Sequence, residues 1–212
     1  MKVLNINDGR EWRANFDTDK FGYYDGELYP AHWSNDGRFL YVAVIKQMDG
    51  RGVIFINANI LLRLNLLTGE MTEILSDGIH VFAFSNNDKM AYLTDKGINI
   101  IDVVTWKSSL YPIDTHYCII GDLLWSPNED KIIYQAWVCN ENYDYSSYNL
   151  FLLNLNNGSS NKIISSTELL PHSLKWENKS PTFKQWDSTN SNEVCLELSL
   201  ESNEWITIDC PE

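Results

Sequence analysis

The residues best equipped for chemistry in this chain are its four histidines and its many carboxylates. His80 and His172 stand four positions before an aromatic residue, Phe84 and Trp176 respectively. A histidine that returns at the same offset in two places indicates packing or hydrogen bonding rather than catalysis. No Cys or carboxylate accompanies these histidines at the spacing of a metal site, and the chain has no glycine-rich phosphate loop, H-E-x-x-H or G-x-S-x-G motif. We therefore expect no catalytic residue, no metal and no cofactor, and we expect that the protein is not an enzyme.

One acidic stretch, residues 17–22 (DTDKFG), begins like the calcium loop of an EF-hand, with Asp17 and Asp19 at its first and third positions. Such a loop needs an oxygen ligand at its fifth position and a Glu at its twelfth. Phe21 and Leu28 stand there instead. The stretch therefore indicates an acidic connector in contact with solvent, not a calcium site.

The charge of the chain is strongly negative, at −13. Residues 81–212 hold 18 acidic against 8 basic side chains. No basic residue follows Lys184, whereas seven acidic ones do: Asp187, Glu193, Glu197, Glu201, Glu204, Asp209 and Glu212. Such a surface repels phosphate groups, so we expect no direct binding to nucleic acid and no binding to an anionic membrane. It favours a basic protein partner, with plain solubility as the alternative explanation.

The cysteines and the N-terminal residues indicate the cellular compartment of the protein. The start, MKVLNINDGREW, has no apolar run after Lys2 and is not typical of a signal peptide. No stretch approaches the about 18 apolar residues of a membrane span. Cys118, Cys139, Cys195 and Cys210 form no CxxC pair. We therefore expect a cytoplasmic protein with buried, reduced thiols.

The predicted strands that would position a binding site occur in repeated segments of the sequence. Three segments, 32–44, 83–95 and 124–138, each run from an aromatic residue through Ser, an Asn- and Asp-rich turn and one basic residue into an apolar strand with a tyrosine. The aromatic residues are Trp33, Phe84 and Trp125, and the tyrosines are Tyr41, Tyr92 and Tyr134. A degenerate fourth copy, 174–186, is anchored by Trp176, and the anchors lie 51, 41 and 51 residues apart. Each copy predicts a β-hairpin.

A second strand–turn–strand unit follows each hairpin, at 63–75, 100–112, 152–164 and 194–208. Four strands in each repeat must stack with those of its neighbours around an axis, because one sheet alone cannot bury both faces. The sequence therefore predicts an all-β fold, a small β-propeller of four to five four-stranded antiparallel blades. We expect a single domain, 1–212, with an N-terminal hairpin or closing strands at 1–30 and repeats at about 31–78, 79–118, 119–168 and 169–210.

The hairpin W-S-x-[ND]-[GD]-[KR]-apolar-Tyr, followed by L-[ND]-L-x-[TN]-G, resembles the repeat of TolB-like and dipeptidyl-peptidase amino-terminal propellers, relatives of the WD-repeat class. The resemblance covers roughly residues 30–210. It implies the fold and not a function, since such propellers have many unrelated roles. It carries over no catalytic residue, because in those families the propeller accompanies an enzyme or binds partners.

Loops of variable length usually mark the binding face of a repeat protein. Long loops are predicted within the first repeat, at 46–58, and within the third, at 139–148. The candidate contacts of the third-repeat loop are Glu141, Tyr143, Asp144, Tyr145 and Tyr148, and those of a connector on the same predicted face are Asp114, His116 and Tyr117. The alternative is a loop whose tyrosines lean on the blade.

Glu193, Glu197 and Glu201 alternate with apolar residues, which places them on the solvent face of a strand. They predict either an acidic docking stripe or a charged edge that discourages aggregation. Together these features favour a non-catalytic protein-binding propeller, most concretely a bacterial immunity protein that neutralises a basic nuclease toxin by covering its active site or substrate surface. The alternatives are a propeller that binds a small molecule or glycan, and an enzyme with a site in the central channel.

Overall fold

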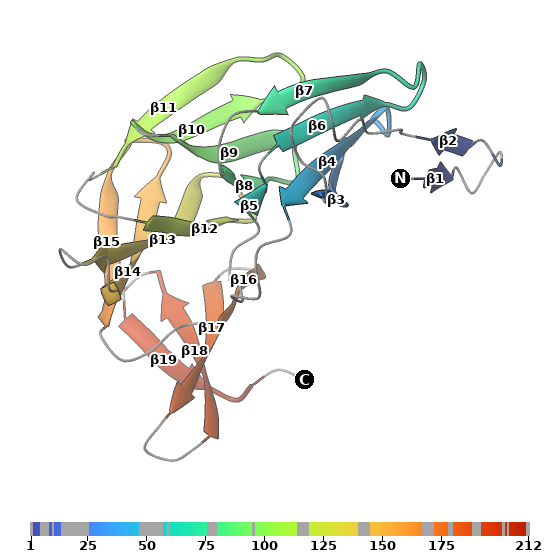
Figure 1. Cartoon of the computed structure of the whole chain (residues 1–212). Coiled ribbons are helices and arrows are strands. Elements are labelled where there is room, and N and C mark those ends of the chain that lie inside the picture. The colour runs from blue at the N-terminus through green and yellow to red at the C-terminus, as the bar shows by residue number, and fades with distance from the viewer. Residues whose placement is uncertain are drawn as a thin grey trace. The chain divides into compact units, whose positions relative to one another are not determined.

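The computed structural model describes residues 2–4, 9, 11–13, 26–46, 57–58, 60–75, 80–94, 96–113, 119–139, 145–166, 172–177, 180–187, 192–200, 202 and 204–210. Every regular element within these ranges is a β-strand. The strands form four antiparallel sheets of four main strands each, and a separate two-stranded sheet (Figure 1). The expected all-β propeller fold is confirmed, with four blades.

In each large sheet the four main strands pair in the order in which they occur along the chain. The first sheet contains β3 (Gly26–Trp33), β4 (Phe39–Lys46), β6 (Ile60–Asn65) and β7 (Met71–Leu75). The second contains β8 (His80–Phe84), β9 (Lys89–Thr94), β10 (Gly97–Asp102) and β11 (Ser108–Pro112), and the short β5 (Asn57–Ala58) is added beside β8. The third contains β12 (Ile119–Trp125), β13 (Lys131–Cys139), β14 (Tyr145–Asn154) and β15 (Ser160–Ser166). The fourth contains β16 (His172–Glu177), β17 (Ser180–Asp187), β18 (Asn192–Ser199) and β19 (Glu204–Ile208).

The chain divides into two compact units, residues 1–81 and 82–212. In the first unit, one face of the first sheet forms a core from Leu40, Val42, Leu62 and Leu64, among others. Val3 is part of the same core. It comes from β1 (Lys2–Leu4), which pairs with β2 (Glu11–Arg13) in the two-stranded sheet. The N-terminal strands therefore contribute apolar surface to the first sheet.

The serine of the repeated motif has a structural purpose that recurs in three sheets. Its side-chain oxygen accepts the backbone amide of the first residue of the next strand. The bonds run from Phe39 to Ser34 (2.8 Å), from Lys89 to Ser85 (3.2 Å) and from Lys131 to Ser126 (3.0 Å). All three serines are buried. Because a buried hydroxyl must be paired, this bond explains why Ser follows the aromatic anchor.

In the first three sheets, the two turns of the hairpin pair lie at one edge of the sheet and are joined by a backbone hydrogen bond. A backbone amide in the turn between the third and fourth main strands donates to a carbonyl in the turn between the first and second. The bonds are Leu66 to Arg38 (2.8 Å), Val103 to Asp88 (3.0 Å) and Leu155 to Asp130 (2.9 Å). The tight turns therefore share one edge, as the meander requires.

Within the second unit, side chains link one sheet to the next at a nearly constant separation. Trp125 donates its indole N–H to the Ala83 carbonyl (3.0 Å), and Trp205 donates to the Ile163 carbonyl (3.4 Å), each across 42 residues. The Tyr111 hydroxyl donates to the Leu155 carbonyl (3.0 Å) across 44 residues. These bonds join the second, third and fourth sheets, and one of the four aromatic anchors, Trp125, takes part in them.

Each of the three repeated strands carries a tyrosine, as predicted, but Tyr41 occupies a different strand position from Tyr92 and Tyr134. Tyr92 and Tyr134 each lie two positions beyond the residue that pairs with the anchor, Met90 and Ile132 respectively. Tyr41 lies one position beyond Leu40, the partner of Trp33. Since successive residues of a strand point to opposite faces, Tyr41 lies on the other face of its sheet from the position that Tyr92 and Tyr134 occupy. Phe39 and Lys131 are each the first residue of the strand after the turn, so Tyr41 and Tyr134 lie at different distances from the start of their strands.

Candidate binding surfaces

Most of the predicted contact residues of the variable loops lie outside the described residues: Glu141, Tyr143, Asp144, Asp114, His116 and Tyr117. Glu201 of the predicted acidic stripe also lies outside them. Tyr145 and Tyr148 are described, and both belong to β14. They pair with Cys139 and Trp137 of β13. The expected loop at 139–148 is therefore shorter than predicted, because β-pairing continues to its second half. The role of these residues in binding stays a prediction.

The fourth sheet places two predicted acidic residues on one face. Glu193 and Glu197 flank Cys195 at alternate positions of β18, while Leu196 and Leu198 point to the opposite face. That opposite face contains Phe183 and Leu198, both buried, and Trp205, which bonds to the third sheet. Glu193 and Glu197 therefore lie on the face turned away from the third sheet.

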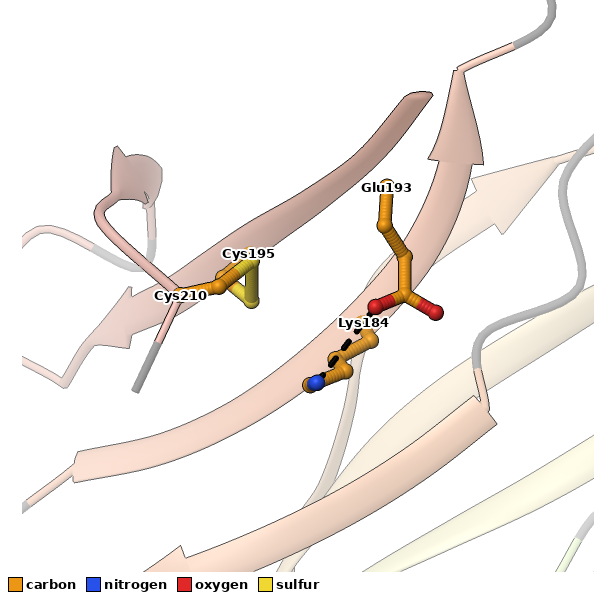
Figure 2. The surroundings of a disulfide bond; sticks show 4 residues. All are labelled: Lys184, Glu193, Cys195 and Cys210. Carbon is orange, nitrogen blue, oxygen red and sulfur yellow. Dashed lines mark hydrogen bonds and ion pairs between the residues drawn. A yellow bond between two sulfur atoms is a disulfide. The ribbon is translucent and has the colours of Figure 1, made fainter. Parts of the chain in front are cut away.

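We call this face the β18 acidic face; it comprises Glu193, Glu197 and the residues paired with them. The face is accessible to solvent, and it also contains a basic residue. Glu193 forms an ion pair with Lys184 of β17 at 3.4 Å, with side chains 42% and 35% exposed (Figure 2). An exposed pair of this kind contributes at most about 1 kcal/mol. Glu204 and Asp209, also in this part of the chain, are exposed as well. Among the described residues of this part of the chain, the exposed acidic residues (Glu193, Glu204 and Asp209) therefore outnumber the exposed basic residue, Lys175.

The same face carries a disulfide bond, which overturns the expectation of reduced thiols for two cysteines. Cys195 and Cys210 are bonded, 15 residues apart, with Cα atoms 5.1 Å from each other (Figure 2). The bond holds the segment after β19 against β18 and leaves Cys195 only 2% exposed. The sequence did not reveal the pairing because the two residues are brought together only by the antiparallel register of β18 with β19.

A buried carboxylate joins the second and third sheets. Glu129, in the turn between β12 and β13, is 4% exposed and contacts Lys89 Nζ at 3.2 Å. It also accepts the backbone amide of Asn87 at 2.7 Å. Burial raises the pKa of this carboxyl, but hydrogen bonds from Ser85, Lys89 and Asn87 outweigh it, so the pKa lies below its ordinary value. Because the charge is fully engaged within the protein, we assign Glu129 a structural role.

A surface feature that the sequence analysis missed is the turn at 102–107, between β10 and β11. Trp106 has a φ of 61°, in the left-handed region. Its side chain is 42% exposed, and that of Val104 is 59% exposed. A residue with a side chain costs about 1–2 kcal/mol in this conformation. The signal was present in the repeat, because Trp106 aligns with the glycine of the L-[ND]-L-x-[TN]-G pattern.

The described part of the chain shows neither a metal cluster nor a membrane-spanning helix. No group of three or more His, Cys, Asp or Glu side chains there is placed to hold a metal ion. Among the same residues, no helix is long and apolar enough to span a bilayer.

No protein-family model and no curated protein matches the sequence, but solved structures do match. The dipeptidyl peptidase 4 of Porphyromonas gingivalis is similar with a TM-score of 0.62 at 9% identity, over 86% of this chain and 32% of the peptidase chain. The oligogalacturonate lyase of Vibrio parahaemolyticus is similar with a TM-score of 0.53 at 12% identity, over 98% of this chain and 71% of the lyase. TolB from Acinetobacter baumannii is similar with a TM-score of 0.50 at 12% identity, over 92% of this chain and 48% of TolB.

These identities are low, and the matched proteins include peptidases, a lyase and TolB, so the likeness establishes the fold and no activity. This chain covers about a third of the peptidase, at 32% of its length. The chain therefore has the β-propeller fold that it shares with TolB and the dipeptidyl peptidase, and its four sheets are propeller blades.

Proposed function

We propose that this protein is a non-catalytic binding propeller whose acidic surface covers a basic protein partner. The observation that carries the proposal is the accessible negative charge of the fourth sheet. Glu193 and Glu204 of this sheet and Asp209 just after it are exposed, and Glu193 is paired with Lys184. An acidic surface of this kind attracts basic proteins and accelerates their association.

The most concrete form of the proposal is a bacterial immunity protein that neutralises a nuclease toxin. A nuclease binds a polyanion, so its substrate surface is basic, and an acidic protein can occupy that surface in place of the phosphates. The charge of −13 on 212 residues supports this mechanism. Inhibition then needs no chemistry in the propeller, only a stable cover over the active site or the substrate surface.

The proposal includes a cytoplasmic location, and the disulfide provides a direct check of it. Disulfides persist in oxidising compartments and are rare in the cytosol. Thiol alkylation in intact cells, followed by mass spectrometry, reports whether Cys195 and Cys210 are free or bonded. Bonded cysteines in cells would contradict the cytoplasmic location and move the proposed binding event to an oxidising compartment.

To test this function, the probe is the protein encoded by the adjacent reading frame, provided that it contains a basic nuclease domain. We expect this propeller to abolish cleavage of RNA or DNA at a one-to-one ratio and to associate more slowly as salt is added. Absence of binding and of inhibition would refute the immunity proposal.

Two variants with the same change of net charge locate the surface. Glu193→Lys/Glu197→Lys reverses the β18 acidic face, whereas Glu70→Lys/Glu73→Lys reverses two exposed residues, one in the turn before β7 and one in β7. We expect the first variant to lower the association rate and to weaken its salt dependence more than the second. Equal effects of both variants would show that net charge, and not this face, governs association. Thermal unfolding of both variants controls for loss of structure.

A further inference from the structure

The last main strand of each large sheet has one edge that no other strand covers in the described part of the chain. These strands are β7, β11, β15 and β19. Every second residue of such a strand directs its backbone amide and carbonyl away from the sheet, where a strand of another protein could pair with them. Proteins usually block such edges with a β-bulge, a proline or a lysine. The presence of these features therefore decides which edge is open to a partner strand.

Three of the four edges carry at least one blocking feature. The pairing of β7 with β6 contains a register shift, and so does the pairing of β15 with β14. The strand β15 also carries the exposed Lys162. The strand β11 pairs regularly with β10, but it ends in Pro112 and follows the exposed Lys107. A partner strand, and above all a basic one, is therefore disfavoured at these three edges.

The fourth edge, that of β19, has none of these features. The strand pairs with β18 without a register shift, and neither a lysine nor a proline stands in Glu204–Ile208. The Cys195–Cys210 bond fixes the segment directly after β19 to β18 (Figure 2). The strand is thus held in place in the free protein, and binding need not pay for ordering it. The β19 edge is therefore the one best prepared to accept another strand.

The side chains along β19 suit a strand that is apolar in its middle and basic at its ends. Ile206, in the middle of β19, is 54% exposed. Glu204, its first residue, and Asp209, directly after its end, are both exposed. Lys184 lies two strands away, on β17, and is paired with Glu193. The residues of the edge itself therefore make it negative at both ends.

We propose that a β-strand of the basic partner adds to the free edge of β19, with basic side chains beside Glu204 and Asp209 and an apolar side chain against Ile206. In such an addition the backbone hydrogen bonds supply affinity, and the side chains supply specificity. Ile206 pairs with Glu197 of β18, so the edge is continuous with the β18 acidic face. This inference rests on the proposed basic partner and adds the mode of binding to it.

The test uses the full chain and the peptide acetyl-Lys-Thr-Val-Thr-Val-Lys-amide, whose two lysines have the same spacing as Glu204 and Asp209. The readout is amide hydrogen exchange of residues 204–208 in ¹H–¹⁵N spectra. We expect the peptide to slow exchange at alternate residues of β19, because every second amide faces the free edge.

A peptide with N-methyl groups on its four central residues is the control ligand, because it keeps both charges and cannot form the hydrogen bonds of a strand. We expect it to bind at least about 5-fold more weakly, the contribution of a single backbone hydrogen bond. We also expect it to leave the exchange of residues 204–208 unchanged.

Ile206→Lys and Leu110→Lys are matched variants, because each places a lysine at an exposed position of a last main strand. Leu110, of β11, is 47% exposed. We expect Ile206→Lys to weaken peptide binding by about 5-fold or more, since it puts a like charge and a blocking residue on the edge. We expect Leu110→Lys to leave binding nearly unchanged. Thermal unfolding of both variants controls for loss of structure.

The outcomes separate the strand addition from the proposed function. If both peptides bind equally well, or exchange at residues 204–208 stays the same, strand addition is refuted while the basic partner stands. Equal losses in the two variants would show that net charge governs binding and would refute the edge. Absence of peptide binding would also refute strand addition, whereas the proposed function is decided by inhibition of the nuclease, which does not depend on the peptide.

Discussion

The Glu129 carboxylate offers the sharpest test of how two sheets are held together. Its side chain, 4% exposed, lies against the turn of the second sheet and contacts Lys89 at 3.2 Å. It also accepts the Asn87 amide at 2.7 Å. We consider two substitutions, Glu129→Ala, which removes every contact, and Glu129→Gln, which keeps an oxygen that can accept the Asn87 amide.

The magnitude follows from these contacts. A hydrogen bond to a charged group contributes about 1.5–3 kcal/mol. The ion pair adds at most about 1 kcal/mol, because Lys89 is 40% exposed and its charge is partly solvated. Glu129→Ala should therefore lower the free energy of unfolding by about 3 kcal/mol, and Glu129→Gln by about 1–2 kcal/mol.

The assay is urea-induced unfolding followed by fluorescence, at neutral and at acidic pH. The pKa of Glu129 in the folded chain lies below the ordinary value of 4.5. The carboxylate therefore stabilises the fold fully above that value, and this contribution is lost as the pH falls through the folded-state pKa. The stability difference between the parent chain and Glu129→Gln should be present at neutral pH and shrink on acidification.

Lys89→Met is the control, because it removes the ion pair and leaves the Asn87 hydrogen bond. We expect Lys89→Met to cost no more than about 1 kcal/mol. Equal stability of Glu129→Ala and the parent chain would refute the reasoning, since it would mean that the turn contact between the sheets contributes nothing. A difference that grows on acidification would refute the assignment of the lowered pKa.

Two further perturbations test the folded framework. Cys195→Ser should lower the free energy of unfolding of the oxidised protein by about 3 kcal/mol, the chain-entropy value for a 15-residue loop. Reducing agent should lower the stability of the parent chain by the same amount and leave that of the variant unchanged. Identical urea midpoints for the oxidised parent chain and the variant would contradict this prediction. Gly97→Ala should cost about 3 kcal/mol, because Gly97 has a φ of 143° and an added Cβ would meet the Tyr111 carbonyl oxygen; an unchanged midpoint would show that this backbone does not require glycine.

Much of the fold followed from local patterns in the sequence. The aromatic residue, the serine and the Asn- and Asp-rich turn are short-range signals, and they located the first hairpin of three sheets correctly; in the fourth sheet the degenerate copy anchored by Trp176 did so. The second hairpins also lie where strand–turn–strand patterns predicted them, at β6–β7, β10–β11, β14–β15 and β18–β19. These signals suffice because a hairpin is specified by its own turn and by the period-two alternation of its strands.

Alternation along β18 likewise predicted that Glu193 and Glu197 share a face. The sequence could not show that Lys184 pairs with Glu193, because that contact depends on the register of β17 against β18. The same limit applies to Tyr41, since a shift of one residue between turn and strand reverses the face of the sheet on which a side chain lies.

Local sequence patterns were enough to predict the repeated hairpins, the acidic charge and the strand residues that alternate between two faces. All three depend on residue types and on neighbours a few positions away. The Cys195–Cys210 bond, the contact of Glu129 with the turn of the second sheet, and the left-handed, exposed state of Trp106 became visible in the folded chain alone. These features arise from the way strands and sheets are brought together, and residues that are distant along the chain carry no local mark of the partner they will meet.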